Sequence, residues 1–376
     1  MEKINRYIEN QLIKSIGSNK VLLLYGTRRV GKTFLIRSIQ EKQGSKTLFL
    51  NGEDFDVQEL FKKRSIANYQ TILGDCSLLI IDEAQAIPEI GKALKLMIDS
   101  FQHLTILATG SSSLDLVNSS GEPLTGRQYA FTLYPFAQTE LSETPFEALQ
   151  RLDERLVFGS YPEVIHIPGR EEKSLYLQQL VQSYLLKDIL AYSGIRHADK
   201  IFSLLRLIAF QAGSEVSYNE LGNQLGMSKI TVENYLDLLS KVFILYKLPS
   251  YSSNHRSEIA KGAKWYFFDN GIRNAVINDF RMPALRNDMG VLWESYVISE
   301  RIKKMRYQRS LTQFYFWRNY QQQEVDLIET ENGQMRGFEI KLSPGKKFKT
   351  SSAFKATYPD CQIEPVHRDN YLDFIL

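Results

Sequence analysis

Residues 26–33 have the sequence Gly-Thr-Arg-Arg-Val-Gly-Lys-Thr, which matches the pattern G-x-x-x-x-G-K-[ST] in full. An apolar run, Val21–Tyr25, precedes this stretch, and a helical pattern, Lys32–Lys42, follows it. A glycine-rich loop between a strand and a helix binds phosphate, because its backbone N–H groups and the helix N-terminus both point at the anion. The stretch therefore predicts a P-loop.

A P-loop of this form predicts ATP and Mg²⁺ as cofactors. Lys32 is expected to bridge the β- and γ-phosphates, and the Thr33 hydroxyl is expected to ligate the magnesium ion. The residues expected to contact the nucleotide are Gly26, Thr27, Arg28, Arg29, Val30, Gly31, Lys32, Thr33 and Phe34.

Two acids end the apolar run Leu78–Asp82 and supply the second half of the expected site. Asp82 can hold magnesium through a water molecule, and Glu83 can orient and polarise the water that attacks the γ-phosphate. The alternative is that both are ordinary acids at a strand end.

Two further positions are candidates for catalysis. The run Leu107–Ser113 ends a strand beside the expected nucleotide, so Thr109 or Ser111 can sense the γ-phosphate or hold the water; alternatively, the serines cap a helix. Arg127 precedes the last strand of this region and can act as an arginine finger, either in cis or from a neighbouring copy in a homo-oligomer. A structural surface arginine is the alternative.

Residues 1–140 alternate apolar runs with helical patterns, which predicts an α/β domain with a mostly parallel sheet in three layers. The helices expected between the strands include Lys32–Lys42 and Ile90–Ser100. The expected strands are Val21–Tyr25, Thr47–Asn51, Leu78–Asp82, Leu104–Thr109 and Tyr129–Leu133.

Residues 141–268 predict a helical and winged-helix segment. Ser217 and Gly226 can cap and end a short helix, Lys229–Val242 forms the next helix, and two strands follow. The polar loop Pro249–Gly262 and its end carry the basic residues Arg256, Lys261 and Lys264. The segment either contacts DNA or only packs against the core, and Glu233 and Asp237 on the second helix would oppose phosphates.

The order of these motifs resembles a widespread family of bacterial and archaeal AAA-type ATPases. The matching stretches are G-T-R-R-V-G-K-T at 26–33, I-I-D-E-A-Q at 80–85, A-T-G-S-S-S at 108–113, L-T-G-R at 124–127, L-Y-P-F at 133–136, F-G-S-Y-P-E at 158–163 and W-Y-F-F-D-N-G at 265–271. At 158–163 the family has G-G-Y-P-E, so in this chain Ser160 replaces the second glycine of that segment. The resemblance covers nearly the whole chain and implies ATP binding.

Residues 269–376 predict an α+β domain that looks like the PD-(D/E)xK nuclease fold, which the same family is thought to share. Glu339 and Lys341 are two residues apart on an expected strand, so they share a face, and Asp326 lies on the neighbouring hairpin strand. In a nuclease-like site, Asp326 and Glu339 would chelate magnesium, Lys341 would position water, and Glu294 would complete the site from a helix. A plain ion pair between Glu339 and Lys341 is the alternative.

Composition bounds the remaining questions. The net charge is +3, with 13 Lys/Arg against 9 Asp/Glu in residues 301–376, which permits a nucleic-acid partner without requiring one. Two distant cysteines and the lack of a long apolar run predict a cytoplasmic protein with no membrane partner. Two functions follow: an ATPase that acts as a switch or motor on DNA, or an ATP-regulated scaffold for a protein partner with an inert nuclease-like domain.

Overall fold

The computed structural model describes residues 4–110, 124–185, 198–252, 262–343 and 351–376. The chain divides into two compact units. The first comprises residues 1–134 and 241–243, and the second comprises residues 135–240 and 244–376.

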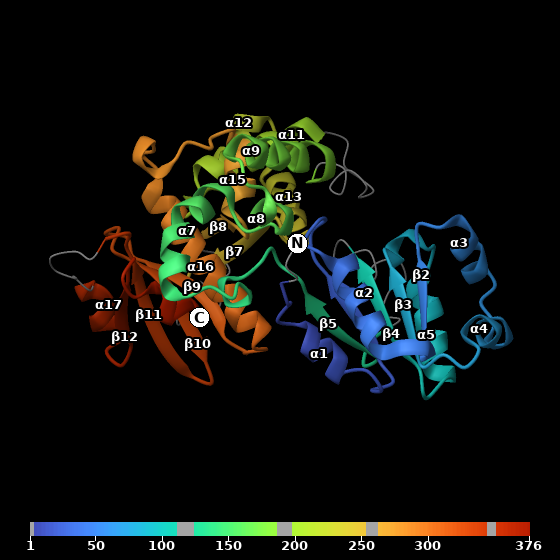
Figure 1. Ribbon diagram of the computed structural model, residues 1–376. Helices are drawn as coiled ribbons and strands as arrows, with labels where there is room; N and C mark the ends of the chain where they lie inside the picture. Colours follow the sequence, from blue (N-terminus) through green and yellow to red (C-terminus); the bar gives the residue numbers. More distant parts are fainter. Residues whose placement is uncertain (1–3, 111–123, 186–197, 253–261, 344–350) are drawn as a thin grey trace. The chain divides into compact units, whose positions relative to one another are not determined.

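The first unit contains a five-stranded sheet in the order β2-β3-β4-β1-β5, in which every pairing is parallel (Figure 1). The strands are β1 (Val21–Tyr25), β2 (Thr47–Asn51), β3 (Leu78–Asp82), β4 (Thr105–Gly110) and β5 (Gln128–Thr132). The helices are α1 (Glu9–Lys14), α2 (Lys32–Gln43), α3 (Phe55–Lys62), α4 (Ile66–Leu73) and α5 (Ile90–Ser100). The predicted parallel α/β fold of this region is confirmed, with each predicted strand displaced by at most one residue.

Three central strands of this sheet are buried along their whole length, as strands covered on both faces are. In β1, the side chains of Leu22, Leu23 and Leu24 are fully buried. Each contributes about 1.5–3 kcal/mol to folding by leaving water. The strand that leads into residue 26 is therefore rigidly held.

The second unit begins with a helical part. Its helices are α7 (Pro145–Phe158), α8 (Pro162–His166), α9 (Arg170–Leu180), α11 (Ala198–Phe210), α12 (Tyr218–Leu225), α13 (Lys229–Lys241) and α15 (Asn270–Ile277). A three-stranded sheet in the order β6-β8-β7 accompanies them, formed by β6 (Glu215–Val216), β7 (Leu245–Pro249) and β8 (Ala263–Phe267).

The local signals in this part act as the sequence predicts. Ser217 caps α12 by accepting a hydrogen bond from the Glu220 N–H, and Gly226 ends the helix in the left-handed conformation. Ser228 accepts a hydrogen bond from the Thr231 N–H at the start of α13. Arg256 and Lys261 lie outside the described residues.

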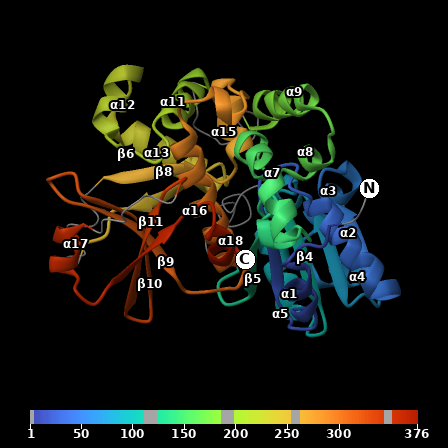
Figure 2. The ribbon, with the colours of Figure 1, turned by 60° about the vertical axis from the view of Figure 1, so that its left-hand side comes forward.

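The unit ends in a four-stranded mixed sheet of order β12-β11-β10-β9, beside which α16 and α18 lie together (Figure 2). The elements are α16 (Met289–Tyr307), β9 (Gln313–Arg318), β10 (Glu324–Glu331), β11 (Gln334–Ile340), α17 (Ser352–Thr357), β12 (Gln362–Val366) and α18 (Tyr371–Ile375). Asn332 and Gly333 both have positive φ and form the tight turn of the hairpin between β10 and β11. The prediction of separate domains at 141–268 and 269–376 stays a prediction, since both ranges, apart from residues 241–243, lie in this unit.

Two of the sequence stretches quoted above contact each other within the second unit. The Asp269 carboxylate accepts hydrogen bonds from the N–H groups of Ser160, at 2.7 Å, and Ile272, at 3.2 Å. A side chain at Gly159 would overlap this carboxylate, and Gly159 also has a φ of +70°. The glycine therefore lets the turn after α7 close on the N-terminus of α15.

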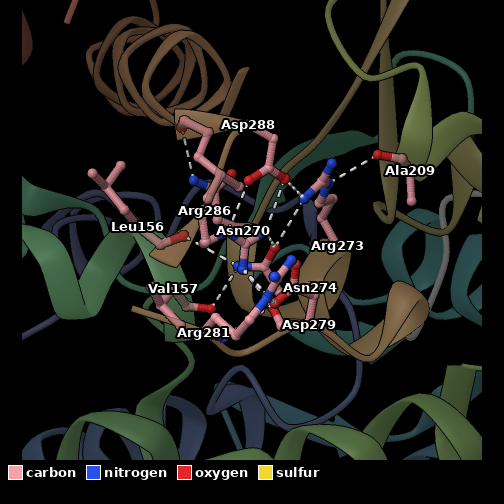
Figure 3. A network of polar contacts seen from close by, with 11 residues as sticks. Leu156, Val157, Ala209, Asn270, Arg273, Asn274, Asp279, Arg281, Arg286 and Asp288 are labelled. Atoms are coloured by element: carbon pink, nitrogen blue, oxygen red, sulfur yellow. Dashed lines mark hydrogen bonds and ion pairs between the residues drawn. The ribbon is translucent and has the colours of Figure 1, made fainter. Parts of the chain in front are cut away.

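A buried polar network holds α15 in place (Figure 3). Arg273 and Arg286 both donate to the Asp288 carboxylate, at 2.6 and 2.8 Å, and both also donate to the Asn274 side-chain oxygen. The Asn274 amide in turn donates to the Val157 carbonyl of α7 at 2.8 Å. The hydrogen bond from Arg286 lowers the pKa of Asp288, burial raises it, and Arg273 lowers it further. The net effect holds the pKa of Asp288 well below its usual range.

We expect Asp288→Asn to destabilise the second unit by about 3 kcal/mol, because it leaves two buried guanidinium groups without their carboxylate. A group with a lowered pKa stabilises the fold above its unfolded pKa and loses that effect on acidification. The difference in the free energy of unfolding between the variant and the natural chain should therefore have its full size near pH 7 and become smaller below roughly pH 4. Urea unfolding of both proteins across this pH range measures it.

Arg281→Gln provides the control. Arg281 pairs with Asp279 at the edge of the same network, but its side chain is 63% exposed. Because solvent screens an exposed ion pair, its loss should destabilise the unit far less than Asp288→Asn does. Equal destabilisation by the two substitutions would show that the buried network has no special role.

Candidate functional site

The P-loop connects β1 to α2 in a backbone conformation that needs glycine at two points. Gly26 has a φ of +155° and Gly31 a φ of +95°, and Gly31 is the N-cap of α2. A side chain at Gly26 would overlap the Leu133 carbonyl oxygen. Arg29 also has positive φ, at +65°, so the loop includes a non-glycine residue in a costly conformation.

Lys32 is the buried cation of the loop. Its side-chain ammonium donates to the Gly26 carbonyl at 2.8 Å and the Thr27 carbonyl at 3.1 Å. The nine residues expected to contact nucleotide, 26–34, all lie on this loop or in the first turn of α2, where Phe34 is 58% exposed.

A continuous chain of hydrogen bonds joins the loop to two neighbouring strands. The Thr33 hydroxyl donates to one carboxylate oxygen of Asp82 at 2.7 Å, and the Thr109 hydroxyl donates to the other at 2.6 Å. The Thr109 oxygen also accepts from the Glu83 N–H at 2.9 Å. The carboxyl ends of β3 and β4 and the start of α2 thus meet at one point.

Glu83 lies just beyond β3 in the left-handed conformation, with a φ of +48°. Its carboxylate accepts a hydrogen bond from the Gln85 side chain. Gly52, directly after β2, packs against its backbone so closely that a Cβ there would lie 2.5 Å from the Glu83 carbonyl oxygen. The backbone of Glu83 is therefore confined from both sides, by Thr109 and by Gly52.

Thr33 and Asp82 fit a magnesium ion by their chemistry. They place a hydroxyl oxygen and a carboxylate oxygen together at the nucleotide edge of the sheet, and Mg²⁺ prefers such hard oxygen ligands. Asp82 is only 6% exposed, so its charge is desolvated and attractive to a cation.

Arg127 lies at the opposite edge of the sheet. β5 pairs with β1 in parallel with Gln128 opposite Val21, so Arg127 precedes the start of β1 whereas the P-loop follows its end. The guanidinium donates to Asp99 at 2.6 Å, and this hydrogen bond raises the pKa of Arg127. This geometry does not favour a role in cis, so a trans role and the alternative of a structural surface arginine both stay open. Ser111 lies outside the described residues.

Sequence analysis missed Arg6, a buried residue ahead of the first helix. Arg6 donates to the Val30 carbonyl of the P-loop at 2.9 Å and to the Tyr134 carbonyl after β5 at 2.5 Å. An isolated arginine near the N-terminus carries no motif. Gly52 was missed as well, although a glycine directly after a predicted strand is a signal for close backbone approach.

The second candidate site lies in the C-terminal sheet, and the structure brings its four predicted residues into one cluster. Asp326 on β10 accepts from the Lys341 ammonium at 2.9 Å and from the Ile340 N–H at 2.7 Å. Lys341 also lies 3.4 Å from the Glu339 carboxylate. Strand β11 ends at Ile340 rather than at Leu342, so Lys341 follows the strand that was predicted to contain it.

Electrostatics connect the fourth residue, Glu294 on α16, to this group. Burial and the nearby Asp326 raise the pKa of Glu339 to about 7. Burial also raises the pKa of Glu294, against the opposing effect of Lys264. Within the described ranges, no three His, Cys, Asp or Glu side chains are arranged to hold a metal ion.

The part of the chain that carries the first site is similar to a known type of domain. Residues 18–142 match the family model described as an AAA domain. The first unit is an AAA-type P-loop ATPase domain. Residues 149–282 and 289–371 match two further models, each described as a domain of unknown function.

Related proteins extend the similarity to most of the chain. An uncharacterized protein of Mycobacterium tuberculosis is 28% identical over 336 residues, covering 88% of this chain and 72% of that protein. One from Methanocaldococcus jannaschii is 26% identical over 394 residues, covering 97% and 83%. The structure of the Thermotoga maritima RuvB Holliday junction branch migration motor covers 65% of this chain and 90% of its own, with 18% identity and a TM-score of 0.33.

In the described part of the chain, no helix has the length and apolarity to cross a membrane.

We expect Gly52→Ala to lower ATP turnover at least about tenfold while ATP binding persists. The added methyl group would collide with the Glu83 carbonyl and displace the expected base, and small displacements at a catalytic centre cost this much or more. Turnover and calorimetric ATP binding measure the two effects. Gly290→Ala is the matched control, because a Cβ there meets nothing within 4 Å. Full turnover in Gly52→Ala would mean that the position of Glu83 is not critical.

Proposed function

We propose that this protein hydrolyses ATP and uses the cycle as a nucleotide-driven switch or motor. The observation that carries the proposal is the hydrogen-bond chain from Thr33 through Asp82 and Thr109 to the backbone of Glu83. It connects the residues expected to hold the nucleotide and its metal with the residue expected to act on water.

Each of these side chains has a separate task in the proposed reaction. The P-loop N–H groups and Lys32 hold the phosphates, while Thr33 and Asp82 would hold Mg²⁺, which when bound neutralises charge on the phosphates. Glu83 accepts a proton from the attacking water, and Gln85 orients its carboxylate. Thr109 couples the two residues because its hydroxyl group donates to the Asp82 carboxylate and accepts from the backbone N–H of Glu83.

We further propose DNA as the partner on which the cycle acts. Support comes from the element order α11-β6-α12-α13-β7-β8, which is that of a winged helix, and from the basic balance of residues 301–376. The exposed acids Glu233 and Asp237 on α13 weigh against phosphate contact by that helix.

The second candidate function is an ATP-regulated scaffold for a protein partner. It is favoured by the acidic residues on α13 and by the ion pairs of Lys341 with Asp326 and Glu339, which compensate charge within the nuclease-like cluster itself. In this function the ATP cycle changes which partner is bound, and DNA has no effect on turnover.

We expect Glu83→Gln to bind ATP but to turn it over at least about 10²-fold more slowly, since the amide keeps the shape but cannot accept the proton. Lys32→Ala should instead lose ATP affinity. Phosphate release and calorimetry, each with and without duplex DNA, measure turnover and binding. Stimulation by DNA supports the first function, and ATP-dependent capture of a protein without DNA stimulation supports the second. Unchanged turnover in Glu83→Gln would contradict the role of this residue.

Arg127 is proposed to act on the nucleotide of a neighbouring copy of the chain. We therefore expect Arg127→Ala and Lys32→Ala proteins, each inactive alone, to regain part of the activity when mixed, because each supplies the residue that the other lacks. Asp99→Asn is the control, since it removes the ion-pair partner of Arg127 but keeps the guanidinium. A protein that stays monomeric with ATP at all concentrations would contradict the trans role.

A further inference from the structure

A buried lysine lies in the C-terminal acidic cluster, where sequence analysis had placed only acids and Lys341. Lys264, on β8, is 1% exposed. Its ammonium contacts the Glu324 carboxylate and lies 3.5 Å from Glu294 and 5.3 Å from the centre of the Phe316 ring. Tyr266, on the same face of β8, donates to the same Glu294 oxygen. The ammonium is therefore enclosed by two carboxylates and an aromatic face.

The remaining acids of the cluster are paired as well. Asp326 and Glu339 share the Lys341 ammonium, and Asp326 also acts electrostatically on Lys264 and on Glu294. Burial lowers the pKa of Lys264, but the attraction of Glu294 and Glu324 outweighs it, so this lysine stays protonated. Four carboxylates thus face two ammonium groups that never lose their charge near neutral pH.

We infer that the ammonium of Lys264 is the resident cation of this cluster and excludes a divalent metal ion from it. A metal ion held by Asp326 and Glu339 would meet the ammonium of Lys341, which pairs with both carboxylates, and would also be repelled by the buried charge of Lys264, which acts electrostatically on Asp326. It would also have to displace the ammonium groups of Lys264 and Lys341 from the carboxylates that they pair with. The residues present therefore do not fit the magnesium site that the nuclease-like pattern implies.

The same contact joins two parts of the second unit. Lys264 lies in the three-stranded sheet, Glu324 is the first residue of β10 in the four-stranded sheet, and Glu294 lies on α16. Arg318 on β9 adds a second connection, lying 3.6 Å from Glu324 and 3.8 Å from Glu215 on β6. The cluster is thus an internal ion-pair joint between the two sheets.

The test is a manganese titration of full-length, nucleotide-free Lys32→Ala protein, followed by electron paramagnetic resonance. With Lys264 intact, we expect no Mn²⁺ bound by the cluster. Adding Lys264→Met removes the charge but keeps an apolar stem of similar length. This variant should melt lower without metal, bind Mn²⁺, and gain roughly 5–10 °C in Tm when the free Mn²⁺ is about a hundredfold above its Kd. Adding Glu324→Gln and Asp326→Asn should abolish the gain.

Lys303→Met is the matched control. Lys303 is also 1% exposed and pairs with Glu300 at 2.8 Å in the same unit, but outside the cluster. Its loss should lower Tm with no gain of Mn²⁺ binding. Two results would overturn the inference: Mn²⁺ binding by the protein with intact Lys264 that Asp326→Asn removes, or a folded Lys264→Met variant that binds none. If Lys264→Met does not fold, the titration with intact Lys264 alone still decides.

Discussion

The Asp82 carboxylate is the point on which the nucleotide site depends. Its two oxygens accept hydrogen bonds from Thr33 at the start of α2 and Thr109 at the end of β4, so a single buried side chain fixes three elements relative to each other. Burying a carboxylate costs free energy unless the group is hydrogen-bonded. The two hydroxyl groups therefore stabilise the edge of the sheet as well as the site. The order of strands β3-β4-β1 brings the three elements together.

The backbone around this point is strained, and the strain positions the P-loop and Glu83 at the expense of stability. Arg29 and Glu83 both adopt left-handed conformations that cost non-glycine residues of the order of 1 kcal/mol or more each. The surrounding contacts compensate: Arg6 holds the Val30 carbonyl, and Gly52 and Thr109 confine Glu83. The loop and the expected base are therefore preorganised, so that binding energy need not be spent on arranging them.

The sequence predicted the first unit well because its signals are local. Continuous apolar runs, a glycine-rich loop and acids at strand ends each occupy a few consecutive residues, and the parallel sheet follows from their alternation. The short helices α3 and α4 were not predicted. The glycine after β2 was a signal for a close approach, but the partners of Arg6 and Gly52 could not be predicted, since these contacts join residues 24 or more positions apart through backbone carbonyls that any sequence supplies. Arg127 was placed correctly along the chain, but only strand register showed which edge it occupies.

The acidic cluster shows most clearly that the sequence predicts which residue types lie on a strand face but not which distant residues that face contacts. The period of two along a strand predicted that Glu339 and Lys341 share a face, and it places Glu324 beside Asp326 by the same rule. It also places Lys264 and Tyr266 on one face of β8, but nothing local indicates that this face meets Glu294 and Glu324, which follow 30 and 60 residues later. Lys264 was therefore named only as one of the basic residues at the end of a polar loop. Its burial reverses that meaning: the same ammonium that would attract phosphate at a surface instead satisfies carboxylates in the interior, and so determines whether the cluster can hold a metal ion.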